Sequence, residues 1–328
     1  MKNKLFEIKD LKTYFYTEAG TAKAVDGVSF DIFKGEVLGI VGESGSGKSV
    51  TSLSINRLIP NPPGEIVEGE IVYGNKNLLE LSYDEMREYR GKDIAMIFQE
   101  PMTSLNPVFK INMQMNEVLM KHEGLSWDEA SKRSIEMLDA VGMPDPEKRM
   151  NDYPHQFSGG MRQRVMIAMA LLCNPALLIA DEPTTALDVT IQAQILDLMV
   201  KMKEKRKDAA ILLITHDLAV IAETCERVIV MYGGKIQEIA NVDELFENPS
   251  HPYTKGLMNS IPHPDSADKK DRLQAIRGTV PPIMKMPDGC KFCTRCDDVL
   301  DKCKTEEPDL LEIKKNHFVR CHLFGDKA

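Results

Sequence analysis

The sequence comprises 328 residues, of which 43% are hydrophobic and 28% charged, and its formal net charge is −9. A chain of this length can bury a large core, and its acidic charge disfavours a protein that binds nucleic acid through a general basic field. The first residues, MKNKLFEIKDLK, lack the apolar run of a signal peptide. The sequence also contains no run of 18 apolar residues, so it predicts no membrane-spanning helix. We therefore expect a cytosolic protein, to which other chains would supply any membrane part.

Strands and helices are predicted to alternate along most of the chain. The patterns favour strands at 5–16, 36–41, 66–73 and 93–98, a helix at 49–59 that the prolines of PNPPG end, and a short polar helix at 84–91. Apolar positions three and four apart predict helices over about 112–172, which would form a separate lobe. After residue 175, apolar strands alternate with amphipathic helices, which indicates a parallel sheet covered on both faces.

The composition changes near residue 249. The segment NPSHPYTKGLMNSIPHPDSADKKD is rich in proline, serine and charge, which is typical of a boundary. We expect a main domain at 1–250, with a helical subdomain at about 100–172, and a C-terminal extension at 251–328.

The stretch GESGSGKS, residues 42–49, lies between an apolar strand and a helix and matches the P-loop pattern. Its glycines permit backbone turns that point successive N–H groups at phosphate oxygens, and the following helix N-terminus adds further donors. Lys48 supplies a cation for the β- and γ-phosphates, and Ser49 a hydroxyl for Mg²⁺. A Gly/Ser-rich turn is the structural alternative. The residues expected to hold the nucleotide are Gly42, Glu43, Ser44, Gly45, Ser46, Gly47, Lys48, Ser49 and Val50.

Polar side chains end three further predicted strands. The strand ALLIADEP ends in Asp181, suited to Mg²⁺, and Glu182, suited to polarise the attacking water as general base. Gln99 ends AMIFQ and can reach the Mg²⁺ or the water, and His216 ends LLITHD and can reach the γ-phosphate. An acidic turn and a structural histidine are the alternatives.

These motifs, in this order, resemble those of the nucleotide-binding subunits of ABC transporters over residues 5–250. The resemblance rests on GESGSGKS, on Gln99, on FSGGMRQR at 157–164, on LLIADE, on TALD at 185–188 and on His216. It implies a P-loop NTPase of α/β class, with an antiparallel β subdomain and a helical subdomain that carries the signature.

The signature departs from the family's usual LSGGQ, because Phe157 and Met161 replace the Leu and the Gln. The resemblance implies that Ser158, Gly159 and Gly160 bind the γ-phosphate of ATP on an opposite subunit, and that Asp188 contributes to the same interface. It also implies that an aromatic residue of the first strand stacks on adenine. We expect Phe15, although Tyr14 and Tyr16 flank it, and a core aromatic is the alternative.

The C-terminal segment resembles the extension of ATPases for oligopeptide and dipeptide import, and most closely that of their D-type subunit. This resemblance implies an ATPase on the cytoplasmic face of a membrane, with a second ATPase subunit, two membrane permease subunits and an extracellular peptide-binding protein. A heterodimer is favoured. An ATPase for nickel or another small solute, or one that works outside transport, is the alternative.

Five of the seven cysteines lie near the C-terminus, spaced Cys290-x2-Cys293-x2-Cys296-x6-Cys303-x17-Cys321. In the resembled extension, cysteines matching Cys290, Cys296, Cys303 and Cys321 ligate a [4Fe–4S] cluster in some members, and Cys293 is additional. Zinc is the alternative metal, with His317 and His322 as further ligands. Free thiols or a disulfide pair are the structural alternative.

Overall fold

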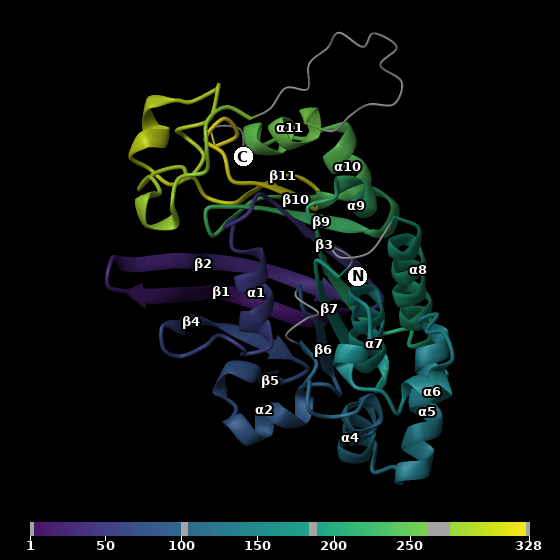
Figure 1. Ribbon diagram of the computed structural model, residues 1–328. Helices are drawn as coiled ribbons and strands as arrows, with labels where there is room; N and C mark the ends of the chain where they lie inside the picture. The colour runs from purple at the N-terminus through teal and green to yellow at the C-terminus, as the bar shows by residue number, and fades with distance from the viewer. Residues whose placement is uncertain (1–2, 100–103, 184–188, 261–275, 326–328) are drawn as a thin grey trace, which may run out of the picture. The chain divides into compact units, whose positions relative to one another are not determined.

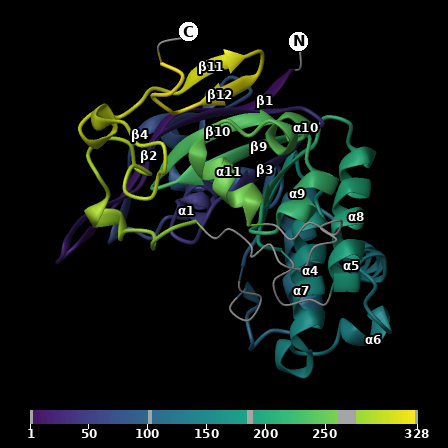
Figure 2. The same ribbon diagram turned by 90° about the horizontal axis from the view of Figure 1, so that it is seen from above.

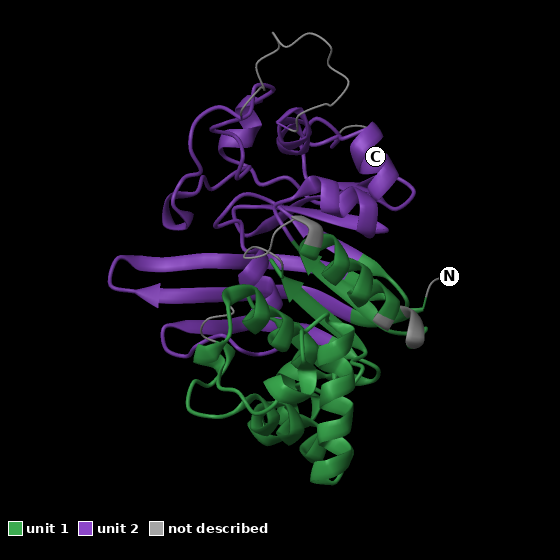
Figure 3. Ribbon diagram, turned by 45° about the vertical axis from the view of Figure 1, so that its right-hand side comes forward, with its two compact units in different colours: residues 1–6, 31–37, 72–214 green, residues 7–30, 38–71, 215–328 purple. Residues whose placement is uncertain are grey.

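The computed structural model describes residues 3–99, 104–183, 189–260 and 276–325. The chain forms two compact units, shown in different colours in Figure 3. Unit 1 comprises residues 1–6, 31–37 and 72–214, and unit 2 comprises residues 7–30, 38–71 and 215–328. Each unit is therefore assembled from segments that lie far apart in the sequence.

The centre of unit 1 is a parallel sheet of β6 (Ile94–Ile97), β7 (Leu177–Asp181) and β8 (Ala210–Ile214). Every residue of these strands is buried, which their apolar sequences predict for strands covered on both faces. The remaining elements of unit 1 are β5 (Lys76–Asn77), η1 (Leu78–Glu80), α2 (Tyr83–Tyr89), α4 (Ile111–Glu123), α5 (Trp127–Ala140), α6 (Pro146–Arg149), η2 (Pro154–Gln156), α7 (Gly159–Leu171) and α8 (Val189–Lys205).

The helices predicted over 112–172 are confirmed as α4, α5 and α7, which pack against one another (Figure 1). The start of α5 is specified by a capping box in which Ser126 and Glu129 satisfy each other's backbone N–H groups. α7 also packs on β6, and all three helices lie in unit 1 with the parallel strands, so the helical subdomain at about 100–172 stays a prediction.

Unit 2 contains a mixed sheet. β3 (Val37–Val41) pairs in parallel with β9 (Arg227–Tyr232), and β9, β10 (Lys235–Asn241), β12 (His317–Val319) and β11 (Leu311–Lys314) then pair antiparallel in that order. The expectation of an all-parallel sheet is thus wrong for this part. Its physical cause is the turn at Gly233 and Gly234, whose φ angles of 59° and 77° reverse the chain into a hairpin.

Unit 2 also contains three long strands and several short helices. The long strands β2 (Gly20–Phe33), β1 (Lys4–Thr17) and β4 (Gly64–Tyr73) lie side by side in that order, and the first and last residues of some of them belong to unit 1. The helices are α1 (Lys48–Ile55), α9 (Leu218–Thr224), α10 (Val242–Glu247), α11 (Pro252–Asn259), η3 (Ile283–Lys285) and η4 (Asp301–Lys304).

The C-terminal extension continues the sheet of unit 2. Glu238 in β10 pairs with Val319 in β12, so strands from both sides of residue 250 share one ladder, and Figure 2 shows the yellow β12 beside the green β10. The boundary predicted at 250/251 falls within unit 2 and stays a prediction. Of the helices in the described parts of the chain, none has the length and the apolar character to cross a membrane.

Candidate nucleotide-binding site

The loop 42–49 joins β3 to α1 and is shaped by its glycines. Gly47 has a φ of 103° and is the N-cap of α1, so that Lys48 is the first helical residue. Gly42 has a φ of 151°, and a Cβ atom there would clash with the carbonyl oxygen of Met231 in β9. Because only glycine fits both positions, the sequence forces the tight turn that carries backbone N–H groups to the helix N-terminus.

Lys48 is 7% exposed and bridges the start of the loop. Its Nζ donates hydrogen bonds to the carbonyl oxygens of Gly42 at 2.7 Å and Glu43 at 3.1 Å. The adjacent turn is fixed as well, since the N–H of Gly234 donates to the carbonyl oxygen of Ser46 at 3.0 Å. The loop therefore holds a cation and a helix N-terminus in one place, which is a site for phosphate.

One aromatic residue of β1 lies on the face of the strand that contacts α1. The hydroxyl of Thr13 in β1 lies 2.8 Å from that of Ser54 in α1, and Phe15, two residues further, shares this face. Phe15 lies against Gly64, where a Cβ would come within 2.8 Å of its ring. Tyr14 is on the other face and donates to Asp26 at 2.6 Å. The alternation therefore favours Phe15, whose stacking on adenine stays a prediction.

In unit 1, the parallel strands β6 and β7 bring two predicted residues together. Asp181 ends β7 and is 3% exposed, and Glu182 follows it with a φ of 47° and donates its N–H to Ile214 in β8 at 2.8 Å. Gln99, just past β6, donates from Nε2 to Oε2 of Glu182 at 3.0 Å. This pair has the groups that orient and deprotonate a water molecule.

The signature segment begins α7 in unit 1. Ser158 is the N-cap, and its Oγ accepts the N–H of Met161 at 3.3 Å. A Cβ on Gly159 would meet no atom within 4 Å, so this end of the helix is open to an approaching group. Further along the helix, the buried Gln163 donates to the carbonyl oxygen of Pro183, which links the signature helix to the chain after Glu182. The sequence contained no signal for this last contact.

Two other predicted residues have different outcomes. His216 is exposed and belongs to unit 2, next to Asp217, whose carboxylate caps α9 by accepting the N–H of Ala219 at 2.9 Å. Its contact with the γ-phosphate stays a prediction. Asp188 lies outside the described residues, as does the rest of TALD.

The comparisons with known proteins decide the family. The sequence pattern of the family described as "ABC transporter" matches residues 25–185, and that of the "Oligopeptide/dipeptide transporter, C-terminal region" matches residues 237–303. The oligopeptide transport ATP-binding protein OppD of Bacillus subtilis is 53% identical over 325 residues, which cover 99% of this chain and 90% of the relative. This chain belongs to the ABC transporter family.

Further relatives and solved structures agree. The oligopeptide protein AppD and the dipeptide transport ATP-binding protein DppD of Bacillus subtilis are 52% and 49% identical, each covering 99% of this chain and 98% and 96% of themselves. The structure is similar to the ATP-binding cassette MJ0796 in a dimeric post-hydrolysis state bound to ADP and Pi, with a TM-score of 0.66 and 29% identity, covering 72% of this chain and 98% of that one. The predicted ABC ATPase fold and ATP hydrolysis are thereby confirmed.

The ABC ATPase carries five of its seven cysteines in a thiol segment, residues 290–321, within unit 2. Cys290, Cys293, Cys303 and Cys321 are buried, and all the cysteines are free thiols. Burial, together with the nearby Cys303, Cys321 and Cys293, raises the pKa of Cys290 to about 12. The thiols therefore share one neighbourhood in an apolar setting that favours the protonated form.

The predicted metal centre is not supported by the arrangement of these groups. Within the described residues, which include all five of these cysteines, no three His, Cys, Asp or Glu side chains are placed to hold a metal ion. The two candidate histidines have other partners. His317 lies 2.7 Å from Glu238 through Nε2, and His322 lies 2.9 Å from the carbonyl oxygen of Glu306.

Proposed function

We propose that this chain is the ATP-hydrolysing subunit of an importer for oligopeptides or dipeptides. The observation that carries the proposal is the match of residues 237–303 to the C-terminal region of oligopeptide and dipeptide transporters, in a chain that aligns over 99% of its length with OppD and DppD. The ATP-binding motifs alone are common to the whole ABC family, so the extension is what distinguishes this class of substrate.

The described side chains support distinct steps of ATP hydrolysis. The loop 42–49 binds the phosphates, and the hydroxyl of Ser49, the carboxylate of Asp181 and the amide of Gln99 are oxygen donors of the kind that Mg²⁺ prefers. Bound Mg²⁺ would neutralise charge on the phosphates. Glu182 serves as general base toward water that Gln99 orients, and His216 contacts the γ-phosphate.

The signature supports a paired ATPase. Ser158, Gly159 and Gly160 form an open helix N-terminus, which suits the γ-phosphate of ATP held by a second subunit. We propose that this partner is a different ATP-binding subunit, and that two membrane permease subunits and an extracellular peptide-binding protein complete the importer on the cytoplasmic face of the membrane.

Reconstitution tests this proposal. The chain is co-expressed with permease and ATPase subunits of a peptide importer from the same organism. The complex is purified, placed in liposomes with the binding protein, and supplied with radiolabelled di- and oligopeptides or with ⁶³Ni²⁺. ATP-dependent peptide uptake is expected. Uptake of nickel without uptake of peptide would reject the peptide assignment in favour of the small-solute alternative, and a chain that copurifies with no membrane subunit would reject a transport function.

A separate proposal concerns the thiol segment. We infer from the residue types and the resemblance that Cys290, Cys296, Cys303 and Cys321 take up a metal centre, with [4Fe–4S] preferred over zinc. Since no three metal-ligating side chains among the described residues are placed to hold a metal ion, only a direct metal analysis can support this proposal. Anaerobic purification followed by iron, sulfide and zinc analysis tests this. Iron and sulfide in equal amounts support the cluster, one zinc supports the alternative, and metal-free protein rejects both.

A further inference from the structure

An arginine of the thiol segment reaches the phosphate loop. Arg295 lies between Cys293 and Cys296, and its side chain is 4% exposed. Its Nη1 donates to Oε2 of Glu43 at 2.6 Å, and its Nη2 donates to Oε1 of the same carboxylate at 3.1 Å. Both residues belong to unit 2, although 252 positions separate them. A two-point pair of this kind fixes direction as well as distance.

The guanidinium of Arg295 is itself held in place on its other sides. Its Nε donates to the carbonyl oxygen of Arg277 at 2.9 Å. Its plane lies over the rings of Tyr232 and Phe292, at 5.8 Å and 5.9 Å from their centroids. Because these hydrogen bonds and ring contacts hold the guanidinium in one orientation, Arg295 is a fixed group and not a mobile surface charge.

Glu43 has a second contact with the extension, through its backbone. Its N–H donates to the hydroxyl of Tyr253 in α11 at 2.8 Å. Tyr253 is fully buried and packs against Tyr232 and Phe292, with ring centroids 4.8 Å and 5.2 Å apart. The same aromatic cluster therefore supports both groups that hold Glu43.

Glu43 in turn shapes the part of the loop that handles phosphate. Its carbonyl oxygen accepts the ammonium of Lys48 at 3.1 Å and the N–H of Ser46 at 3.2 Å. A rotation at residue 43 would therefore displace the lysine and the turn together. Nothing in the pattern GxxxxGKS requires a carboxylate at this position, since the pattern leaves it open.

We propose that Arg295 is a positioning residue for ATP, which acts through Glu43 to set the conformation of the phosphate loop. The C-terminal extension then contributes directly to nucleotide affinity, in addition to its place in the sheet. This inference rests on the proposed function only insofar as the loop binds MgATP.

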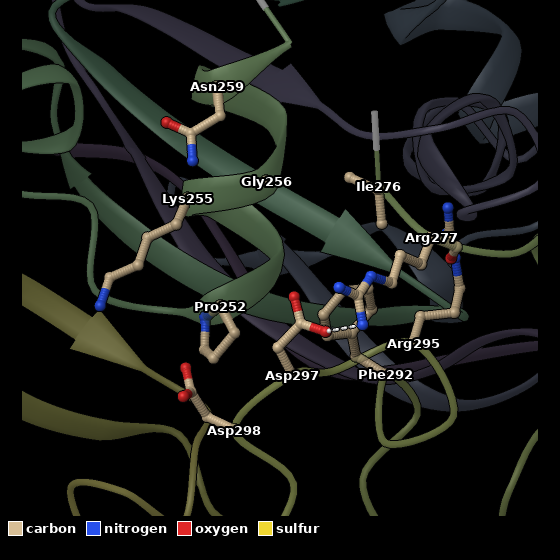
Figure 4. A pocket seen from close by; sticks show the side chains of 10 residues that line it. All are labelled: Pro252, Lys255, Gly256, Asn259, Ile276, Arg277, Phe292, Arg295, Asp297 and Asp298. Carbon is tan, nitrogen blue, oxygen red and sulfur yellow. Dashed lines mark hydrogen bonds and ion pairs between the residues drawn. The ribbon is translucent and has the colours of Figure 1, made fainter. Parts of the chain in front are cut away.

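A neighbouring arginine provides the matched control. Arg295 and Arg277 both line one pocket, which has a volume of about 470 Å³. Figure 4 shows the two side chains in that lining. Arg277 forms an ion pair with Asp297 at 3.1 Å, and both side chains are largely exposed, at 82% and 72%. The substitution Arg277→Ala removes a guanidinium from the same pocket and leaves the backbone carbonyl that Arg295 uses.

The test compares the full chain with Arg295→Ala, Arg295→Lys and Arg277→Ala, by equilibrium binding of MgATP and steady-state ATPase kinetics. We expect Arg295→Ala to raise the Kd and the KM about tenfold, while kcat changes less than about threefold, because small displacements of a positioned group are costly. Arg295→Lys, which keeps the charge but not the fork, should give an intermediate Kd. Arg277→Ala should match the wild type.

A second variant separates positioning from a general loss of stability. Glu43→Gln leaves the extension intact, and it should raise the Kd in the same direction. If the two residues act through each other, the double variant Glu43→Gln/Arg295→Ala should be no weaker than Arg295→Ala alone. A folded Arg295→Ala protein with a wild-type Kd, or fully additive effects in the double variant, would overturn the inference. A wild-type chain that fails to bind MgATP would instead overturn the proposed function.

Discussion

The phosphate loop and the hydrolytic residues differ in how firmly the protein holds them. In unit 2, Lys48 is buried and bonded to two loop carbonyls, and the loop's first residues are fixed by Tyr253 and Arg295. In unit 1, Gln99 is exposed, Glu182 is only half-buried, and a hydrogen bond of 3.0 Å joins them. The loop proposed to bind phosphate is thus held firmly within unit 2, whereas the two residues proposed to activate water lie in unit 1 and are exposed or half-buried.

This difference indicates that binding and turnover respond separately to mutation. A preorganised loop binds phosphate without further rearrangement, so its residues should govern affinity. Side chains at an exposed strand end can act on water only when the nucleotide and a second subunit exclude solvent, so they should govern the rate.

The largest effect is expected at the hydrolytic end. Glu182→Gln removes the carboxylate that we propose as the general base but keeps a group able to bond with Gln99, so ATP binding should persist and ATP-bound dimers should accumulate. Turnover should fall by about two to four orders of magnitude. Steady-state ATPase rates and size-exclusion chromatography with ATP measure both. The control Glu247→Gln, at an exposed position of α10, should leave both unchanged. Unimpaired turnover in Glu182→Gln would remove this residue from catalysis.

The next effect is expected in the phosphate loop. Lys48→Ala removes the buried cation that we propose binds the phosphates, and the Kd for MgATP should rise on the order of a hundredfold, in keeping with loss of a desolvated charge partner. Isothermal titration calorimetry measures the Kd, and Lys285→Ala, an exposed lysine of the same unit, is the matched control. An unchanged affinity would contradict the role of the loop.

A smaller effect is expected at the signature. Ser158→Ala removes the N-cap of α7, so the free energy of unfolding should fall by about 1 kcal/mol. Dimer formation with ATP should weaken as well, while the Kd of the monomer for ATP stays constant. Ser158→Thr retains a capping hydroxyl and should recover the stability. Urea unfolding and analytical ultracentrifugation measure the two effects. A higher Kd for ATP in the Ser158→Ala monomer would contradict the inference that unit 2 alone governs ATP affinity.

The smallest effect concerns pH and unit 2. His251 is fully buried, and this burial lowers its pKa from 6.5 to about 4, although the charge of Glu238 opposes the shift. Between about pH 6.5 and pH 4, the imidazole of His251 is therefore protonated in the unfolded chain but neutral in the folded protein. The free energy of unfolding should fall as the pH drops through this range. It should be unaffected by this group at higher pH.

A variant isolates this contribution. The Nδ1 of His251 accepts the N–H of Tyr253 at 3.0 Å, and the side-chain oxygen of an asparagine can accept the same bond without titrating. Between pH 7 and pH 5, His251→Asn should therefore lose less stability in urea unfolding than the wild type. Equal losses would assign the acid sensitivity to other groups.

The sequence identified most of the secondary structure and the residues of the nucleotide motifs. Buried strands such as Leu177–Asp181 were predictable because their apolar run has the length of a buried strand and is too short for a helix. The glycines of the loop 42–49 were predictable because positive φ angles are costly for other residues. The antiparallel end of the sheet was not predicted, because alternation of apolar residues does not specify which strand a hairpin will pair with.

The sequence by itself determined that this protein is an ABC ATPase and that glycines shape the loop 42–49, because backbone requirements and motif order depend on residues close together in the chain. Only the tertiary structure decided which distant residues support that loop. Arg295 and Tyr253 meet Glu43 across more than two hundred positions, because β12 extends the same sheet that β3 and β9 begin. Contacts of this kind depend on how strands pair and aromatic rings pack, which no local pattern around Glu43 encodes.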